Sequence, residues 1–222
     1  MIQAWQKRLL NNRPAVQYDF SEAGTHTQVL DAGIYDMWLV GAGGGGLLFN
    51  VSLPSDKMYA DGGVGGVLHV RVAVQVQTAV TVNVGTGGES KINGPASGTY
   101  SAVAGGATTI TGLANVTLSA GGGEPGTITF TSVTDNIRTP GAQGTNTATG
   151  KNVLKVFANN AIKIISQEGE SSARSRDYAG QPNTNWAEDT TKGAGGQVGW
   201  TAPTRIISNP GGGGFVRIKT AE

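Results

Sequence analysis

Apolar and polar residues alternate with a period of two along several stretches of the chain. In residues 67–74 every second position is leucine or valine, and residues 80–84 carry valine at every second position. The positions between them are mostly polar or small. Such alternation is typical of antiparallel β-strands that bury one face. We expect a turn near residues 75–78 between these two strands, and the pattern as a whole predicts an all-β protein.

Short runs of glycine accompany these stretches. Glycine accounts for 36 of the 222 residues, against a usual share of about 7%. Most runs directly precede or follow an alternating stretch, and they lie at residues 43–46, 62–63, 65–66, 87–88, 105–106, 121–123, 195–196 and 211–214. Because glycine has no Cβ, neighbouring backbones can pack side by side. The sequence therefore predicts a glycine-rich antiparallel β-sandwich, and it leaves open whether the runs form polyglycine II helices.

The N-terminal segment differs from the rest of the chain. Ile2, Trp5 and Leu9 are spaced i, i+3 and i+7, which predicts a short amphipathic helix over residues 2–10. Such a helix is too short to be stable alone and would have to dock on something. We therefore interpret residues 1–24 as an attachment segment. The alternative is a frayed, disordered terminus.

Residues 25–222 are interpreted as one glycine-rich β domain. Residues 124–192 contain fewer glycine pairs and more charge, and we expect an insertion there. Within it, apolar residues at 153–157 and 162–165 flank two asparagines at 159–160, which predicts a hairpin with a tight turn.

One motif imitates a nucleotide-binding site. Residues 41–46 satisfy the G-x-G-x-x-G pattern after the predicted strand 34–40. A dinucleotide site also needs a helix that opens at the third glycine, since its N-terminus holds the pyrophosphate. Pro54 and further glycines follow instead, so we set this interpretation aside.

Charge and composition exclude other classes. The net charge of +1 provides no general attraction to nucleic acid. The sequence has no run of 18 apolar residues, so membrane insertion is not expected. Cysteine is absent, and His26 and His69 are far apart in sequence, so we expect neither a metal nor a cofactor. Acidic pairs such as Glu168 and Glu170 lie in polar stretches, where solvated charges are expected. The protein is therefore not expected to be an enzyme.

Aromatic residues in the polar stretch are the candidates for binding. Tyr178, Trp186 and Trp200 are accompanied by Asn183 and Asn185. Aromatic planes beside amide hydrogen-bonding groups suit a sugar or a protein surface. The alternative is that the aromatic rings only cap the sheet.

Five motifs in order carry a family resemblance. They lie at residues 35–46, 80–88, 105–110, 118–123 and 211–218. Together they resemble the glycine-rich domain found in bacteriophage tail proteins.

This resemblance implies a virion protein, namely a tail fibre or tail tip component that binds the host cell surface. Its implied partners are other tail proteins and a host glycan or outer-membrane protein. A homo-oligomer is implied, with a trimer favoured, and the protein is expected in the virion tail after synthesis in the host cytoplasm without a signal peptide. The alternative is a purely structural baseplate, neck or capsid decoration protein.

Overall fold

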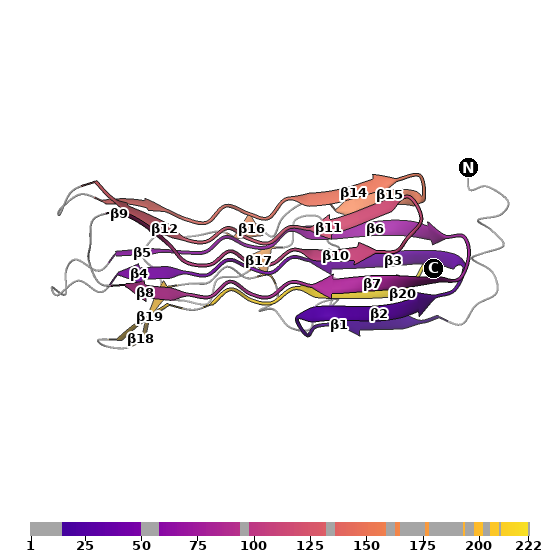
Figure 1. The fold of residues 1–222 in the computed structure, drawn as a ribbon, viewed down its shortest axis with the longest axis horizontal. Coiled ribbons are helices and arrows are strands. Elements are labelled where there is room, and N and C mark those ends of the chain that lie inside the picture. The colour runs from indigo at the N-terminus through magenta and orange to yellow at the C-terminus, as the bar shows by residue number, and fades with distance from the viewer. Residues whose placement is uncertain are drawn as a thin grey trace.

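The computed structural model describes most of the chain. The described residues are 15–49, 58–93, 98–131, 136–158, 163–164, 176–177, 193, 198–201, 205–208 and 210–221. They form strands and contain no helix, which confirms the predicted all-β class. The helix predicted over residues 2–10, with Ile2, Trp5 and Leu9, lies outside the described residues. The molecule is elongated. β-Sheets lie at both ends, and segments of chain that belong to no strand run side by side between them (Figure 1).

Two five-stranded sheets occupy one end of the molecule. The first sheet has the order β1 (Gln17–Phe20), β20 (Phe215–Thr220), β3 (Gly33–Val40), β6 (Val67–Val74) and β15 (Val153–Ala158). The second sheet has the order β14 (Asn146–Gly150), β11 (Val116–Ala120), β10 (Thr108–Thr111), β7 (Thr78–Val84) and β2 (Gly24–Leu30). All neighbours within these two sheets are antiparallel.

The alternating side chains meet between these sheets in one apolar core. Val70 and Val72 of the first sheet are fully buried in it, as are Val82 and Ile110 of the second. The predicted turn is also confirmed, because β6 ends at Val74 and β7 begins at Thr78. The period-two pattern thus folds into the predicted antiparallel β-sandwich.

Shorter sheets form the far end of the molecule. One has the order β13 (Asn136–Thr139), β12 (Thr127–Phe130) and β9 (Gly98–Ser101), and the other β5 (Met58–Ala60), β4 (Leu47–Phe49) and β8 (Lys91–Asn93). The pair β4–β8 is parallel. A second small core of Leu47, Ala60, Ala102 and Ile128 lies between these sheets. Two hairpins complete the described strands, β16 (Lys163–Ile164) with β17 (Arg176–Asp177) and β18 (Val198–Thr201) with β19 (Arg205–Ser208).

The glycine runs connect the two ends. Each pass of the chain consists of a strand, a glycine-containing segment and a second strand, as in β3, residues 41–46 and β4. The other segments of this kind are 61–66, 85–90, 102–107, 121–126 and 140–145, and residues 210–214 lead into β20. Residues 124–158, the first part of the predicted insertion, supply β12 to β15, the end of segment 121–126 and the whole of segment 140–145.

Residues 41–46 form the centre of this region. Their N–H groups donate to three other segments in turn. Gly41 and Gly44 donate to segment 61–66, at the carbonyls of Gly66 and Gly63 respectively. Ala42 and Gly45 donate to segment 102–107, at the carbonyls of Gly106 and Val103, and Gly43 donates to the carbonyl of Gly212. The bonding direction thus repeats every third residue. A repeat of three residues without hydrogen bonds inside the segment is the geometry of a polyproline II-type helix. The glycine runs therefore form a polyglycine II arrangement, which the sequence had left open.

Six neighbours surround the central segment, and adjacent neighbours are bonded to one another. Going round the ring, the backbone hydrogen bonds are Gly63 to Glu124, Gly105 to Gly123, Gly106 to Thr86, Gly211 to Gly88, Gly193 to Gly213 and Gly65 to Gly193, each at 2.7–2.9 Å. The ring is therefore closed. Residues 141–145 lie outside it and bond to segments 61–66 and 121–126. We call this hexagonally packed region the glycine lattice.

The lattice requires glycine because its segments approach closely. A Cβ placed on Gly44 would lie 2.0 Å from the carbonyl oxygen of Glu124, and one on Gly45 would lie 2.0 Å from that of Glu89. Real Cβ atoms cannot occupy those positions, so the Cα–H groups contact the oxygens directly. Dense backbone packing thus offsets the entropy that ordered glycines lose.

One local prediction is wrong. Residues 153–157 and 162–165 were expected to form a hairpin, but β15 pairs with β6 and β16 pairs with β17. The physical reason is a partner far away in sequence, since the ring of Phe157 stacks on His69 of β6. A long-range contact thus overrides the local turn signal.

Candidate functional site

The outer face of the first sheet carries a set of aromatic and charged side chains. Alternation along β3 and β6 turns Asp36 and Trp38, and also His69 and Arg71, away from the sandwich core. The register places Trp38 directly opposite His69 and Asp36 directly opposite Arg71. Cross-strand pairs of this kind are the basic stabilising contacts of a sheet.

Three rings are stacked on this face. His69 lies between Trp38 and Phe157, with ring centroids 4.3 Å apart on each side and interplanar angles of 16° and 19°. Trp38 is 8% exposed, whereas Phe157 at the edge of the sheet is 38% exposed. Lys155 Nζ lies 4.6 Å from the centroid of the Phe157 ring, which is within range for a cation–π contact. The accessible part of the site is thus a phenyl ring flanked by a cation.

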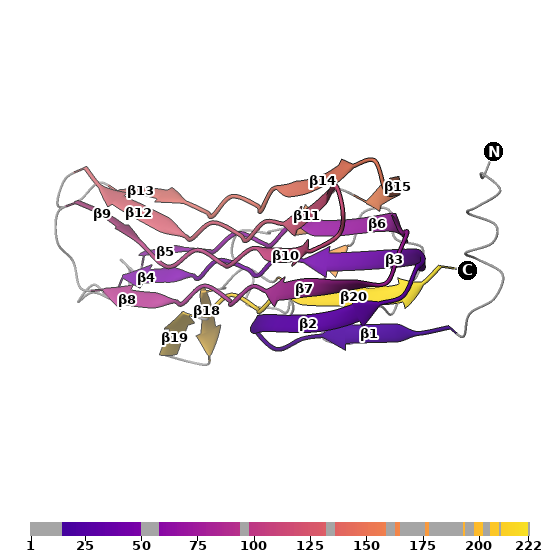
Figure 2. The same cartoon turned by 45° about the vertical axis from the view of Figure 1, so that its right-hand side comes forward.

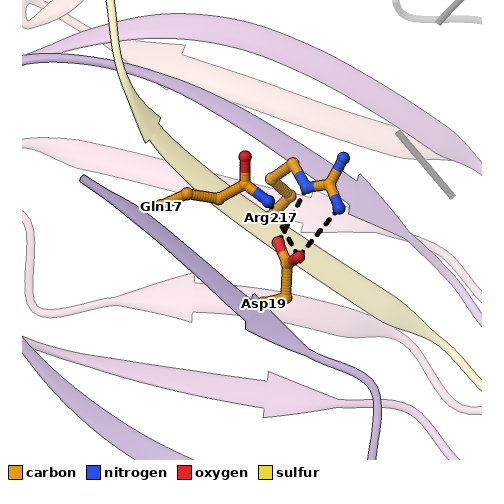
Figure 3. Close-up of polar contacts among 3 residues, drawn as sticks. All are labelled: Gln17, Asp19 and Arg217. Atoms are coloured by element: carbon orange, nitrogen blue, oxygen red, sulfur yellow. Dashed lines mark hydrogen bonds and ion pairs between the residues drawn. The ribbon is translucent and has the colours of Figure 1, made fainter. Parts of the chain in front are cut away.

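Two ion pairs border the stack. Arg71 donates from Nε and Nη2 to the two carboxylate oxygens of Asp36, both at 2.7 Å. Arg217 of β20 makes the same bidentate contact with Asp19 of β1 at 2.7 and 2.8 Å, and Gln17 Nε2 also donates to Asp19 (Figure 3). Such forked pairs fix the orientation of both side chains.

The electrostatics of the site follow from burial and these pairs. Burial alone would raise the pKa of Asp19, but hydrogen bonds from Arg217 and Gln17 and the charge of Arg217 hold it below its ordinary value. Burial lowers the pKa of His69 to about 4, helped by the charge of Arg71 and opposed by that of Asp36. His69 is therefore a neutral ring at pH 7.

Some polar atoms of the site have no partner of their own. Trp38 Nε1 and His69 Nε2 are buried without a hydrogen-bond partner, so two polar atoms remain unsatisfied beside the stack. Among the described residues, no three side chains of His, Asp or Glu are grouped as metal ligands. An exposed aromatic edge, cations and fixed carboxylates suit contact with another macromolecule.

Of the site residues predicted from sequence, one lies in the described part of the chain. Trp200 lies on β18, opposite Ile206 of β19, and β19 contacts β4 in the far half of the molecule. The other binding candidates, Tyr178, Asn183, Asn185 and Trp186, and the attachment candidates, Ile2, Trp5 and Leu9, lie outside the described residues. The structure therefore places only Trp200 among these candidates.

A family model described as a glycine-rich domain matches residues 21–221. The chain belongs to this family. Among curated proteins, none matches its sequence. Within the part of the chain that the structure describes, no helix is long and apolar enough to span a membrane.

The lattice also explains the nucleotide-like motif of this glycine-rich domain. The N–H groups of residues 41–45 all donate to carbonyls of other lattice segments. They are therefore not available to a pyrophosphate, and the chain continues into β4 rather than a helix. The G-x-G-x-x-G match serves the packing of backbones.

Sequence reasoning missed the ring stack as a site. It proposed neither Trp38 nor His69 as a binding residue. Both residues are largely covered, but they lie on the face opposite the main core. The alternation of polar and apolar residues places His69 and Arg71 on that face, yet only the register between β3 and β6 pairs them with Trp38 and Asp36.

Proposed function

We propose that this glycine-rich domain is a virion protein of a tailed bacteriophage, where it forms part of a tail fibre or tail tip and binds the host cell surface. The placement of the chain ends carries the proposal. The N–H of Thr220 donates to the carbonyl of Val16 at 3.0 Å, so both ends of the described chain lie at the sandwich end (Figures 1 and 2). A protein held there projects its opposite end outward.

The glycine lattice supports this role mechanically. Its segments run lengthwise between the two sets of sheets (Figure 2), and hydrogen bonds cross-link each segment to its neighbours. Bending the molecule would break several of these bonds at once. The far end is therefore carried on a stiff support, as a projecting adhesin requires.

The two ends have different roles in this proposal. The outer face of the first sheet, with Phe157 and Lys155, contacts other tail proteins together with the N-terminal segment of Ile2, Trp5 and Leu9. Trp200 contacts a host glycan or outer-membrane protein, because its hairpin lies beside the far half of the molecule. The remaining receptor candidates are Tyr178, Asn183, Asn185 and Trp186. Binding takes place without catalysis.

A pair of variants tests this division. Labelled Trp200→Ala protein should adsorb to host cells at least tenfold more weakly than the wild type, while its incorporation into particles is unchanged. Phe157→Ala removes an exposed aromatic side chain near the other end, so it should reduce incorporation and leave cell adsorption intact. If wild-type protein binds neither host cells nor extracted surface polysaccharide, the receptor-binding role is wrong.

A purely structural role remains the second candidate. It would place the protein in the baseplate, in the neck or on the capsid. Imaging of particles that carry labelled protein distinguishes the two, since an adhesin lies at the distal tail and a decoration protein on the head.

A further inference from the structure

The second sheet has an open edge at β2. Among the described residues, β2 pairs on one side only, with β7, in seven consecutive register pairs from Gly24–Val84 to Leu30–Thr78. The register contains no shift. An open edge of this kind presents unpaired backbone N–H and C=O groups to any strand of matching shape.

The other three edge strands of the sandwich are protected. β1 has four residues and carries Asp19 in its ion pair with Arg217. β15 carries Lys155 and has two register shifts against β6. β14 lies beside β15, and its Asn146 side chain donates to the carbonyl of Val67. Short length, charge, bulges and cover are the usual means by which proteins block edge pairing.

β2 has none of these protections. Its sequence, GTHTQVL, contains no Lys, Arg, Asp, Glu or Pro. Thr25, Thr27 and Val29 point outward from the sheet, and Val29 is 50% exposed. A long, regular and uncharged edge strand favours association through the strand itself.

We propose that β2 pairs antiparallel with β2 of a second copy of this chain, so that two second sheets join into one continuous sheet. An antiparallel pair centred on Thr27 places Thr27 opposite its own equivalent and Thr25 opposite Val29. On the other face, His26 lies opposite Gln28; within one chain His26 Nε2 bonds to the carbonyl of Glu22, and Gln28 Nε2 donates to the carbonyl of Val29. The Thr27 pair is of a kind that stabilises neighbouring strands, because opposed threonines can hydrogen-bond.

The charge distribution favours a second copy as the occupant. None of the strands β2, β7, β10, β11 and β14 contains Lys, Arg, Asp or Glu, whereas the first sheet holds the ion pairs. A two-fold contact brings identical surfaces together, so a charge close to the axis would face its own copy. The uncharged second sheet avoids this repulsion. The inference stands independently of the proposed function, and it replaces the trimer that the family resemblance favoured.

Cysteine cross-linking tests the pairing directly, because the chain has no cysteine of its own. Directly opposed residues of antiparallel strands have Cα atoms about 4.5–5.5 Å apart, which a disulfide can span. Thr27→Cys should therefore form a covalent dimer under mild oxidation. Thr117→Cys is the matched control, an exposed threonine on β11 of the same sheet, which has a neighbouring strand on both sides, and it should remain uncross-linked.

Introducing a charge at the centre of the proposed strand pair provides a second test. Thr27→Lys places two like charges opposite each other and should convert the dimer into a monomer in light scattering, whereas Thr117→Lys should remain a dimer. Circular dichroism verifies that both variants fold, and if Thr27→Lys does not, the cysteine pair decides. A wild-type monomer or trimer, or cross-linking through Thr117 but not Thr27, overturns the proposal.

Discussion

Trp38 and His69 lie directly opposite each other on β3 and β6, and their rings stack with centroids 4.3 Å apart. Phe157 covers the other side of the imidazole at the same distance. The imidazole is thus held between two aromatic rings on a face that also carries the ion pair of Asp36 and Arg71. This arrangement couples the proton affinity of one histidine to the packing of three strands.

The stack predicts an acid-sensitive stability. In the folded protein the pKa of His69 is about 4, compared with 6.5 ordinarily. At pH values between these two, the unfolded chain therefore binds a proton at His69 that the folded protein does not. Stability is therefore fully present above pH 6.5 and is lost as the pH falls toward 4. His69→Phe keeps an apolar ring in the stack and should remove this dependence. Melting temperatures of both proteins at pH 7, 5.5 and 4 provide the measurement.

The size of this effect is limited by solvent access. Since His69 is only partly buried and faces both Asp36 and Arg71, we expect a loss of about 1–2 kcal/mol rather than the full value of the shift. Equal slopes for the wild type and His69→Phe would show that other groups cause the acid sensitivity.

A single methyl group in the lattice should be severely destabilising. Gly44→Ala would place its Cβ 2.0 Å from the carbonyl oxygen of Glu124, and backbone segments held by neighbours on all sides cannot move apart easily. We expect a loss of about 3 kcal/mol or more in the free energy of unfolding, at the upper end of overpacking effects. Urea denaturation measures the change.

Gly33→Ala is the matched control for this substitution. Its added Cβ would meet only the ring of Tyr35, at 3.3 Å, and that side chain can shift slightly. Its cost should therefore be about 1 kcal/mol or less. Similar losses at Gly33 and Gly44 would contradict the close packing of the lattice.

The ion pair of Asp36 and Arg71 should contribute little stability in spite of its short contacts. Both side chains retain some exposure, and partly solvated pairs are worth about 0.2–1 kcal/mol. A double-mutant cycle with Asp36→Asn and Arg71→Gln measures the coupling, which high salt should reduce further. A coupling above about 2 kcal/mol would instead indicate a pair shielded from water.

The sequence predicted the parts of this fold that depend on neighbouring residues. Alternation in residues 67–74 and 80–84 identified two strands, the turn between them and the buried faces, because strand geometry links each side chain to the next but one. Glycine runs beside the strands predicted close backbone packing. Each of these inferences uses only local periodicity.

The parts it missed depend on residues that meet only in the folded chain. The lattice joins Gly43 to Gly212 and Gly65 to Gly193, and no local pattern specifies such partners. The position of Phe157 likewise depends on irregular pairing of β15 with β6. The expected hairpin through residues 159–160 was wrong because a short local turn signal cannot compete with that ring contact.

Hydrogen exchange should identify the lattice as one of the most protected regions of the chain. The N–H groups of residues 41–45 are buried and donate to five different carbonyls, so exchange requires several segments to separate together. We expect these amides to exchange as slowly as those of β3, although they belong to no strand. Ala104, an exposed residue of the surrounding segment 102–107, should exchange much faster. Rapid exchange throughout residues 41–45 would instead indicate that the glycine runs are a loose connection, and a stiff support for the far end of the molecule would then be ruled out.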